Sequence, residues 1–165
     1  MLDLTVDEYE GDYLLTGDAW EELVWVWQRT DVPRGCKTEI IDGTVTVAPY
    51  SAVAHHALSE PLQRRLYEVL PQSWHVLQGL ALAVPSRSSL YVPDLVVVPE
   101  AAERSRDDDS FVPGAAELVV EITSTVTARR DRGTKAAGYA EAGVPLYLLV
   151  DGSAPDGPHA VRSSK

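Results

Sequence analysis

The chain contains little sulfur, little lysine and no long apolar segment. Its 165 residues include one Cys and one Met, and its three lysines are Lys37, Lys135 and Lys165. The lone Cys36 excludes a disulfide within the chain and a zinc site with several cysteine ligands. No segment approaches the roughly 20 apolar residues that span a bilayer, and the first residues lack the basic flank and apolar stretch of a signal peptide. We therefore expect a soluble, cytoplasmic protein with no membrane association.

Basic residues are also few relative to acidic ones. The chain has 14 Lys plus Arg and 25 Asp plus Glu, a formal net charge of −11. Such a balance argues against a protein that holds nucleic acid through an extended basic surface. Most of the excess lies in residues 1–31, which contain nine acids and one base, a net of −8. The rest of the chain is only mildly acidic, so a local DNA site within it is not excluded.

The pattern of apolar residues predicts an α/β fold with a central mixed β-sheet flanked by α-helices. We expect one domain over residues 1–165, with an acidic arm at 1–12, an exposed loop at 100–116 and a polar tail at 152–165. Asp42-Gly43 predicts a tight hairpin turn, since this dipeptide tolerates positive φ. The expected helices cover residues 19–30, 55–70 and 124–142, and the expected strands cover 37–49 as a hairpin, 75–84, 91–98, 117–123 and 146–150.

Two carboxylates interrupt apolar strands. Asp94 opens the strand in VPDLVVV, and Glu121 lies inside the strand in ELVVEIT. A buried carboxylate without a compensating partner costs several kcal/mol, so each requires one. Together they suit a hard cation such as Mg²⁺ or Mn²⁺, which prefers oxygen ligands. The alternative is a strand-edge turn at Asp94 and a structural salt bridge at Glu121.

Three further groups could contribute to such a site. Lys135 could pair with Asp131 one helical turn away or reach back over the strand ends. Glu39 lies beside β-branched residues, as a solvent-facing residue of an alternating strand also would. His55 and His56 begin the second expected helix and could carry a proton, although adjacent histidines cannot both face one site.

Arg129, Arg130 and Arg132 form a local basic cluster with Lys135, directly after the strand that contains Glu121. Arginines beside a carboxylate-bound metal could bind the phosphates that flank a scissile bond. The alternative is a solvated helix face. The chain has no glycine-rich phosphate loop of the G-x-G-x-x-G or Walker type and no G-x-S-x-G elbow, which weakens support for nucleotide-cofactor enzymes and for serine hydrolases.

Taken in order, these residues resemble a known family, the Uma-type restriction endonucleases of the PD-(D/E)xK nuclease superfamily. The resemblance extends over roughly residues 12–151. The motifs are Glu39-Ile-Ile-Asp42-Gly43, Pro49 followed by His55, Pro93-Asp94-Leu-Val-Val-Val, Leu-Val-Val-Glu121-Ile-Thr-Ser124, and Asp131-x-x-x-Lys135-x-x-x-Tyr139-Ala-x-Ala-Gly143-Val-Pro145-x-Tyr147.

The resemblance implies a restriction endonuclease-like fold and metal-dependent hydrolysis of DNA phosphodiester bonds. By position, Asp94 and Glu121 would bind Mg²⁺ or Mn²⁺, Glu39 would be an additional catalytic acid, and Lys135 would be the basic residue of the catalytic site. The sequence departs from the superfamily at Thr123, where a lysine is usual, and in the short polar tail that follows Asp151. The chain is either truncated there or naturally short.

Two other interpretations remain open. The same fold could be a catalytically inactive module that binds DNA or a protein partner, and it could be a homodimer; Thr123 and the acidic balance favour this interpretation. Alternatively, the acidic N-terminal arm could occupy the arginine cluster as an autoinhibitor.

Overall fold

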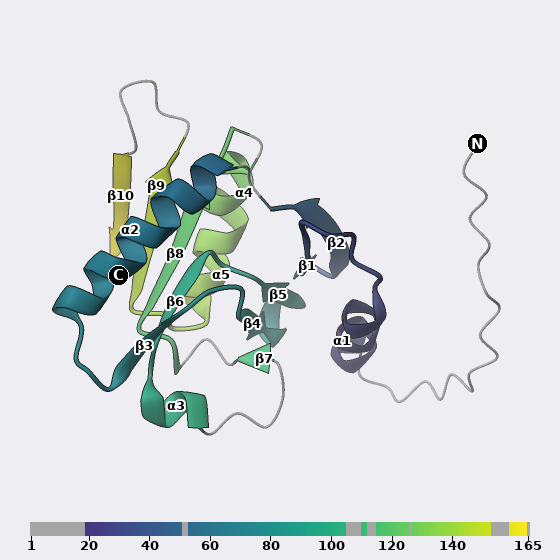
Figure 1. Ribbon diagram of the computed structural model, residues 1–165. Coiled ribbons are helices and arrows are strands. Elements are labelled where there is room, and N and C mark those ends of the chain that lie inside the picture. The colour runs from purple at the N-terminus through teal and green to yellow at the C-terminus, as the bar shows by residue number, and fades with distance from the viewer. Residues whose placement is uncertain are drawn as a thin grey trace.

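The computed structural model describes residues 19–50, 53–104, 110–111, 115–125, 127–152 and 159–164, and the expected acidic arm at 1–12 lies outside them. Two five-stranded sheets and their helices make up this part of the chain (Figure 1). No helix of the described residues has the length and apolarity needed to cross a membrane.

The first sheet has the strand order β2-β1-β5-β4-β7. Its strands are β1 (Cys36–Ile41), β2 (Thr44–Pro49), β4 (Ala81–Val84), β5 (Ser89–Tyr91) and β7 (Ser110–Phe111). The hairpin between β1 and β2 forms at the expected turn, where Asp42 and Gly43 have φ of +46° and +79°. All pairs are antiparallel except β4 with β7.

The second sheet has the order β10-β9-β8-β6-β3. Its strands are β3 (Trp74–Leu77), β6 (Leu95–Pro99), β8 (Leu118–Thr123), β9 (Leu146–Asp151) and β10 (His159–Ser164). Only β8 and β9 are parallel. Each sheet thus contains antiparallel pairs and one parallel pair, which confirms the expected mixed α/β class.

Two strand predictions were wrong in extent. Residues 75–84 divide into β3 and β4, and residues 91–98 divide into β5 and β6, with each member in a different sheet. The first break contains Gly79 at φ +66°, and the second contains Pro93. A left-handed residue and a proline both interrupt a strand, and the apolar pattern on either side hides the break.

Two regions expected to lack regular structure contain elements. The segment expected as a loop includes α3 (Glu100–Arg104) and β7, and the expected polar tail includes β10. The tail prediction was wrong because HAVRSS lacks apolar alternation. Its backbone nevertheless pairs along β9 from His159 opposite Asp151 to Ser164 opposite Leu146.

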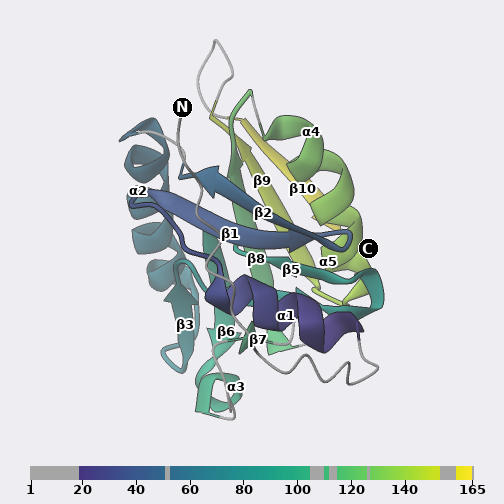
Figure 2. The same ribbon diagram turned by 90° about the vertical axis from the view of Figure 1, so that its right-hand side faces the viewer.

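Alternate residues of the second sheet face two different cores. Val96, Val98 and Val119 lie in the main core, which also contains Leu82 and Tyr91 of the first sheet. Their neighbours Leu95, Val97 and Val120 pack on the other face. There they contact Leu62 and Leu66 of α2 (Val53–Val69) and Leu70, which follows this helix. The helix α1 (Ala19–Arg29) covers the outer face of the first sheet (Figures 1 and 2).

The helix after β8 has a wide turn. It runs through α4 (Ala128–Arg130), the π-helical segment η3 (Asp131–Lys135) and α5 (Ala136–Glu141). A short π-helical segment alters the direction of side chains relative to a regular α-helix and is frequent at functional sites. Gly138 lets this helix approach the first sheet, because a Cβ atom there would lie 2.7 Å from the Tyr91 ring.

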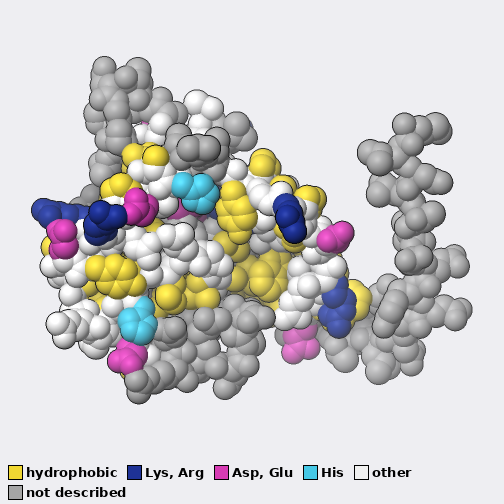
Figure 3. All heavy atoms as spheres, in the orientation of Figure 1, with side chains coloured by type: hydrophobic (Ala, Val, Ile, Leu, Met, Phe, Trp, Pro, Cys, Tyr) yellow, Lys and Arg dark blue, Asp and Glu magenta, His cyan; other side chains and the backbone are white. Residues whose placement is uncertain are grey.

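Charged side chains of both signs are interspersed on the face shown in Figure 3. On α2, Arg64 pairs with Glu60 and Arg65 pairs with Glu68. This face therefore has no extended basic surface among its described residues.

Candidate active site

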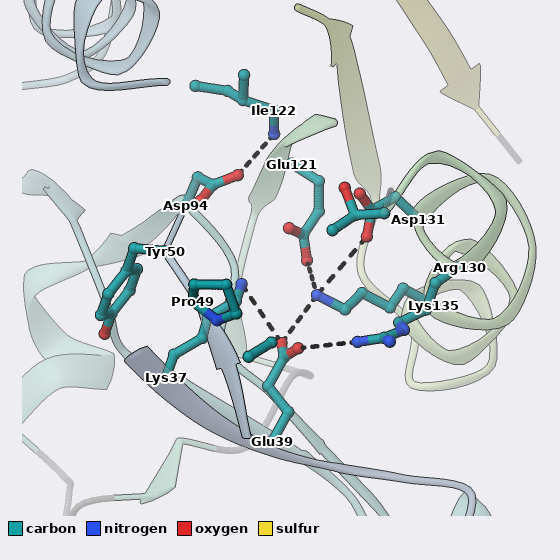
Figure 4. A pocket seen from close by; sticks show the side chains of 12 residues that line it. Lys37, Glu39, Pro49, Tyr50, Asp94, Glu121, Ile122, Arg130, Asp131 and Lys135 are labelled. Atoms are coloured by element: carbon teal, nitrogen blue, oxygen red, sulfur yellow. Dashed lines mark hydrogen bonds and ion pairs between the residues drawn. The ribbon is translucent and has the colours of Figure 1, made fainter. Parts of the chain in front are cut away.

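A small cavity lies where β1, the end of β8, the link from β5 to β6 and the π-helical segment meet (Figure 4). Its volume is about 30 Å³, which is enough to hold a water molecule. Its charged lining consists of four carboxylates and three cationic side chains, a formal charge of −1: Glu39, Asp94, Glu121, Asp131, Lys37, Arg130 and Lys135.

Glu39 contributes the carboxylate from the first sheet. It is 2% exposed, so the solvent-facing interpretation is wrong. Its Oε1 accepts a hydrogen bond from the backbone N–H of Val92 at 2.8 Å and lies 2.8 Å from Lys135 Nζ. Burial raises the pKa of Glu39, but Lys135 and Lys37 outweigh it and hold that pKa below its ordinary value of 4.5.

Glu121 contributes the carboxylate from the second sheet. It shares a face of β8 with Val119, which directs it toward the main core and the first sheet. Lys135 Nζ and Tyr139 Oη each donate a hydrogen bond of 2.9 Å to its Oε1. Burial raises the pKa of Glu121 to about 7 despite the opposing effect of Lys135. A cation bound at this carboxylate would favour its ionised form.

Lys135 lies between the carboxylates and is 2% exposed. Its Nζ is 2.8 Å from Glu39, 2.9 Å from Glu121 and 3.8 Å from Asp131. The helical pair with Asp131 and the reach toward the strand ends therefore occur together, and the contacts to the strands are shorter. Burial lowers the pKa of Lys135, but Glu121, Glu39 and Asp131 raise it above its ordinary value, so the side chain stays an ammonium.

Asp94 follows the link between the two sheets. Its backbone N–H donates to Val120 O at 3.1 Å, and its Oδ2 accepts from the N–H of Ile122 at 2.6 Å. These two bonds bind the start of β6 to β8 on both sides of Glu121. The backbone bends at Asp94 just before β6, as the turn interpretation predicts, and the side chain also lines the cavity.

Two charged residues of the cavity were not among the predicted site residues. Lys37 Nζ donates to Val92 O at 2.7 Å and lies 3.6 Å from Glu39 Oε1. Its position two residues before Glu39 on a strand places both on one face, a signal that could have identified it. Asp131 is 3% exposed, and the Tyr147 hydroxyl donates to its carbonyl oxygen at 2.8 Å. For Asp131, the sequence signal that could have identified it was its spacing of one helical turn from Lys135.

The three arginines of the basic cluster separate. Arg130 lines the cavity, and its Nη1 lies 3.9 Å from Glu39 Oε2. Arg132 is paired with Asp151 instead, and Arg129 is exposed and does not line the cavity. The structure therefore brings one of the three to the candidate site.

Of the two predicted histidines, the structure places only the side chain of His56, which does not line the cavity. His56 is exposed and lines a neighbouring cavity that also includes Asp94, and the side chain of His55 lies outside the described residues. Thr123 is 2% exposed, and its hydroxyl lies 3.2 Å from the Thr127 hydroxyl. It does not replace the usual lysine, whereas the Lys135 amine reaches Glu121 from the helix.

The donor set of the cavity fits a hard divalent cation held by Asp94 and Glu121. Both hydrogen bonds from Lys135 and Tyr139 go to Oε1 of Glu121, and the lining has a net negative charge. Among the described residues, no group of three His, Cys, Asp or Glu side chains is arranged to hold a metal. Two carboxylates nevertheless suffice for Mg²⁺, which usually keeps several waters.

Comparisons with known proteins agree with this architecture. The family model Uma2, described as "Putative restriction endonuclease", matches residues 20–160. The chain is also similar to the crystal structure of "a putative nuclease belonging to DUF820" from Anabaena variabilis, at 17% identity and a TM-score of 0.66, covering 84% of this chain and 78% of that chain. At this identity the likeness concerns the fold, and it confirms the expected restriction endonuclease-like class. None of the curated proteins compared with the chain is a match.

Proposed function

The chain belongs to the Uma2 family, which is described as "Putative restriction endonuclease", and from this premise we propose that it is a metal-dependent endonuclease that hydrolyses DNA phosphodiester bonds. The observation that carries the proposal is the position of Lys135. Its ammonium lies between Glu39 and Glu121 in a cavity that Asp94 also lines. The family likeness and the fold support a nuclease, and the cavity supports this site for the reaction.

In the proposed reaction, Asp94 and Glu121 would hold Mg²⁺ or Mn²⁺. When bound, such an ion lowers the pKa of a water and neutralises charge that develops on the phosphate. Lys135 acts as a hydrogen-bond donor because its raised pKa keeps it protonated. It therefore orients the attacking water or stabilises the negative charge of the pentacovalent phosphorane, and it does not accept the proton.

In this proposal, Glu39 and Lys37 fix the positions of the groups that take part in the reaction. Glu39 accepts the N–H of Val92 while Lys37 donates to the carbonyl oxygen of the same residue. Both contacts fix the link that leads to Asp94. Glu39 also holds the Lys135 amine, so it is a positioning residue for the two groups nearest the reaction.

Replacing each of the two proposed metal ligands with the amide of the same shape tests the function. Cleavage of DNA in Mn²⁺, measured on both single-stranded and duplex DNA, should be abolished in Asp94→Asn and in Glu121→Gln, and titration calorimetry should show saturable Mn²⁺ binding that Glu121→Gln loses. Asn at position 94 keeps an oxygen that can accept the Ile122 N–H, so the fold should be retained. Asp42→Asn is the matched control, because Asp42 lies at the hairpin turn outside the cavity. Undiminished cleavage by Asp94→Asn would contradict the proposal.

A non-catalytic module that binds DNA or a protein partner is the second candidate. It is favoured by the lack of a three-residue metal-binding group within the part of the chain that the structure describes. This candidate requires no saturable Mn²⁺ binding, so the same calorimetric titration separates the two functions.

A further inference from the structure

Tyr50 stands exposed beside the candidate active site. It follows β2 directly and is 47% exposed, although it is aromatic. Its backbone N–H donates to Gly35 O at 2.7 Å, and Pro49 precedes it, so these two features constrain its backbone position. Figure 4 shows the ring next to Pro49, on the side of the cavity away from Arg130. The ring is thus held on a fixed support while much of its surface stays accessible.

Tyr50 lines three cavities that differ in size. The small cavity of about 30 Å³ has room for an ion or a water. A second cavity, of about 320 Å³, shares Tyr50 and Asp94 with it, and a third, of about 450 Å³, shares Tyr50 and Lys37. The larger two fall within the range of small-molecule sites, which suits a nucleobase. A group the size of one base can therefore lie against Tyr50, and in the second cavity it lies next to Asp94.

The second cavity offers hydrogen-bonding groups for the edge of a base. It is lined by His56, Ser59 and Gln78 as well as by Asp94. The amide of Gln78 and the imidazole of His56 can each donate and accept hydrogen bonds, which are the contacts that base edges require. The proximity of these groups to Asp94 places such a base beside the proposed scissile phosphate.

Electrostatics at the site do not favour a duplex held by its phosphates. The three cations of the small cavity, Lys37, Arg130 and Lys135, all have Glu39 within 4.0 Å. Outside residues 1–31 the chain has 16 acidic and 13 basic residues, so it has no excess of positive charge there either. Because neutralising phosphates supplies most of the affinity for duplex DNA, binding here needs another source. Stacking of bases on aromatic rings supplies it for single strands, whose bases are accessible.

We propose that Tyr50 is a stacking platform for a base adjacent to the scissile phosphate, and that the substrate is single-stranded or locally unpaired DNA. The location of the scissile phosphate in this proposal rests on the proposed function. In a continuous duplex the bases are stacked on one another, so the Tyr50 ring has no free base face to contact.

Binding measured without cleavage tests the proposal. Fluorescence anisotropy with a labelled oligo(dT) and with a duplex of equal length, both in EDTA, should show tighter binding of the single strand. Tyr50→Leu should weaken single-strand binding by roughly fivefold to more than 100-fold, the range for loss of one stacked base. Tyr50→Phe keeps the ring and should bind as the wild type does. Quenching of a 2-aminopurine base should likewise be lost in Tyr50→Leu and kept in Tyr50→Phe.

Tyr67→Leu is the matched control, since Tyr67 is 51% exposed on α2 and lines none of the three cavities. Its single-strand affinity should equal that of the wild type. Equal or tighter binding of the duplex by the wild type, or unchanged affinity in Tyr50→Leu, overturns the proposal. Cleavage of duplex DNA in Mn²⁺ that ignores Tyr50→Leu contradicts this inference alone. Single-strand binding through Tyr50 without any cleavage in Mn²⁺ contradicts the proposed function alone.

Discussion

The Lys135 ammonium lies 2.9 Å from the Glu121 carboxylate, although 14 positions separate the two residues along the chain. The same nitrogen lies 2.8 Å from Glu39, which belongs to the other sheet. One buried cation thus joins carboxylates from two sheets. Stability of the fold and geometry of the candidate site therefore depend on the same contact, and changes at Lys135 should affect both.

Lys135→Met should lower the free energy of unfolding by about 3–5 kcal/mol, because it leaves Glu39 and Glu121 buried without their shared cation. Urea denaturation followed by circular dichroism measures the change. The double variant Lys135→Met/Glu121→Gln should be less destabilised than the single variant, since one of the uncompensated charges is then absent. Stability of Lys135→Met equal to that of the wild type would show that the ammonium does not hold the two sheets together.

Glu39 should make the fold sensitive to acid. Its pKa in the folded protein is lowered from the ordinary value of 4.5, mainly because Lys135 and Lys37 outweigh the effect of burial. A lowered folded pKa contributes stability that is present above the unfolded pKa and is lost as pH falls through the folded pKa. The difference in unfolding free energy between the wild type and Glu39→Gln should therefore shrink as pH falls below 4.5. Urea titrations at a series of pH values measure it, and a difference that is constant with pH would contradict the prediction.

Gly138→Ala should destabilise the fold by about 1–3 kcal/mol through overpacking. The added Cβ would lie 2.7 Å from the buried Tyr91 ring, which cannot move freely. Gly133→Ala is the matched control in the same helix, because nothing lies within 4 Å of its Cβ position. That variant should be unchanged or more stable by up to about 1 kcal/mol. Thermal unfolding distinguishes them, and equal melting temperatures would exclude a tight contact at Gly138.

Arg130→Ala should weaken DNA binding and reduce cleavage more than Arg132→Ala does. Arg130 lines the cavity beside Glu39, whereas Arg132 is paired with Asp151 outside it. If Arg130 contacts a phosphate, its removal should also lower the salt dependence of binding by about one counterion. Anisotropy titrations at several salt concentrations measure this slope. An equal effect of the two variants would show that DNA binding depends on the overall positive charge of this helix and not on Arg130 in particular.

Local chemistry made part of the fold predictable. Asp42-Gly43 predicted the hairpin because a tight turn needs positive φ at those positions. Glu121 was identifiable because an acid inside an apolar strand requires a partner. The division into two sheets was not predictable, since the apolar runs before and after Gly79 and Pro93 are alike and sheet partners are distant in sequence.

The candidate site was also predictable only in part. The acids within the strands follow from the pattern. Lys135 ends a π-helical segment, which the residues DRGTK do not predict, and its contacts with Glu39 and Glu121 are tertiary contacts that spacing alone does not determine. Lys37 and Tyr50 come from the hairpin, whose position beside Asp94 is set by tertiary packing. The pairing of β10 follows from its backbone contacts with β9, which its polar side chains do not reveal.

The link between β5 and β6 has a consequence for the kinetics of folding. Glu39, Glu121 and Lys135 come from a hairpin in one sheet, a strand in the other and a helix, and the chain crosses between the sheets just before Asp94. Contacts between such distant segments require the closure of long loops, which has a high entropic cost, and they form after local contacts. During refolding, competence to bind a metal should thus appear only with the last phase, after helix formation is complete. In a time course, metal affinity would report docking of the two sheets and not secondary structure.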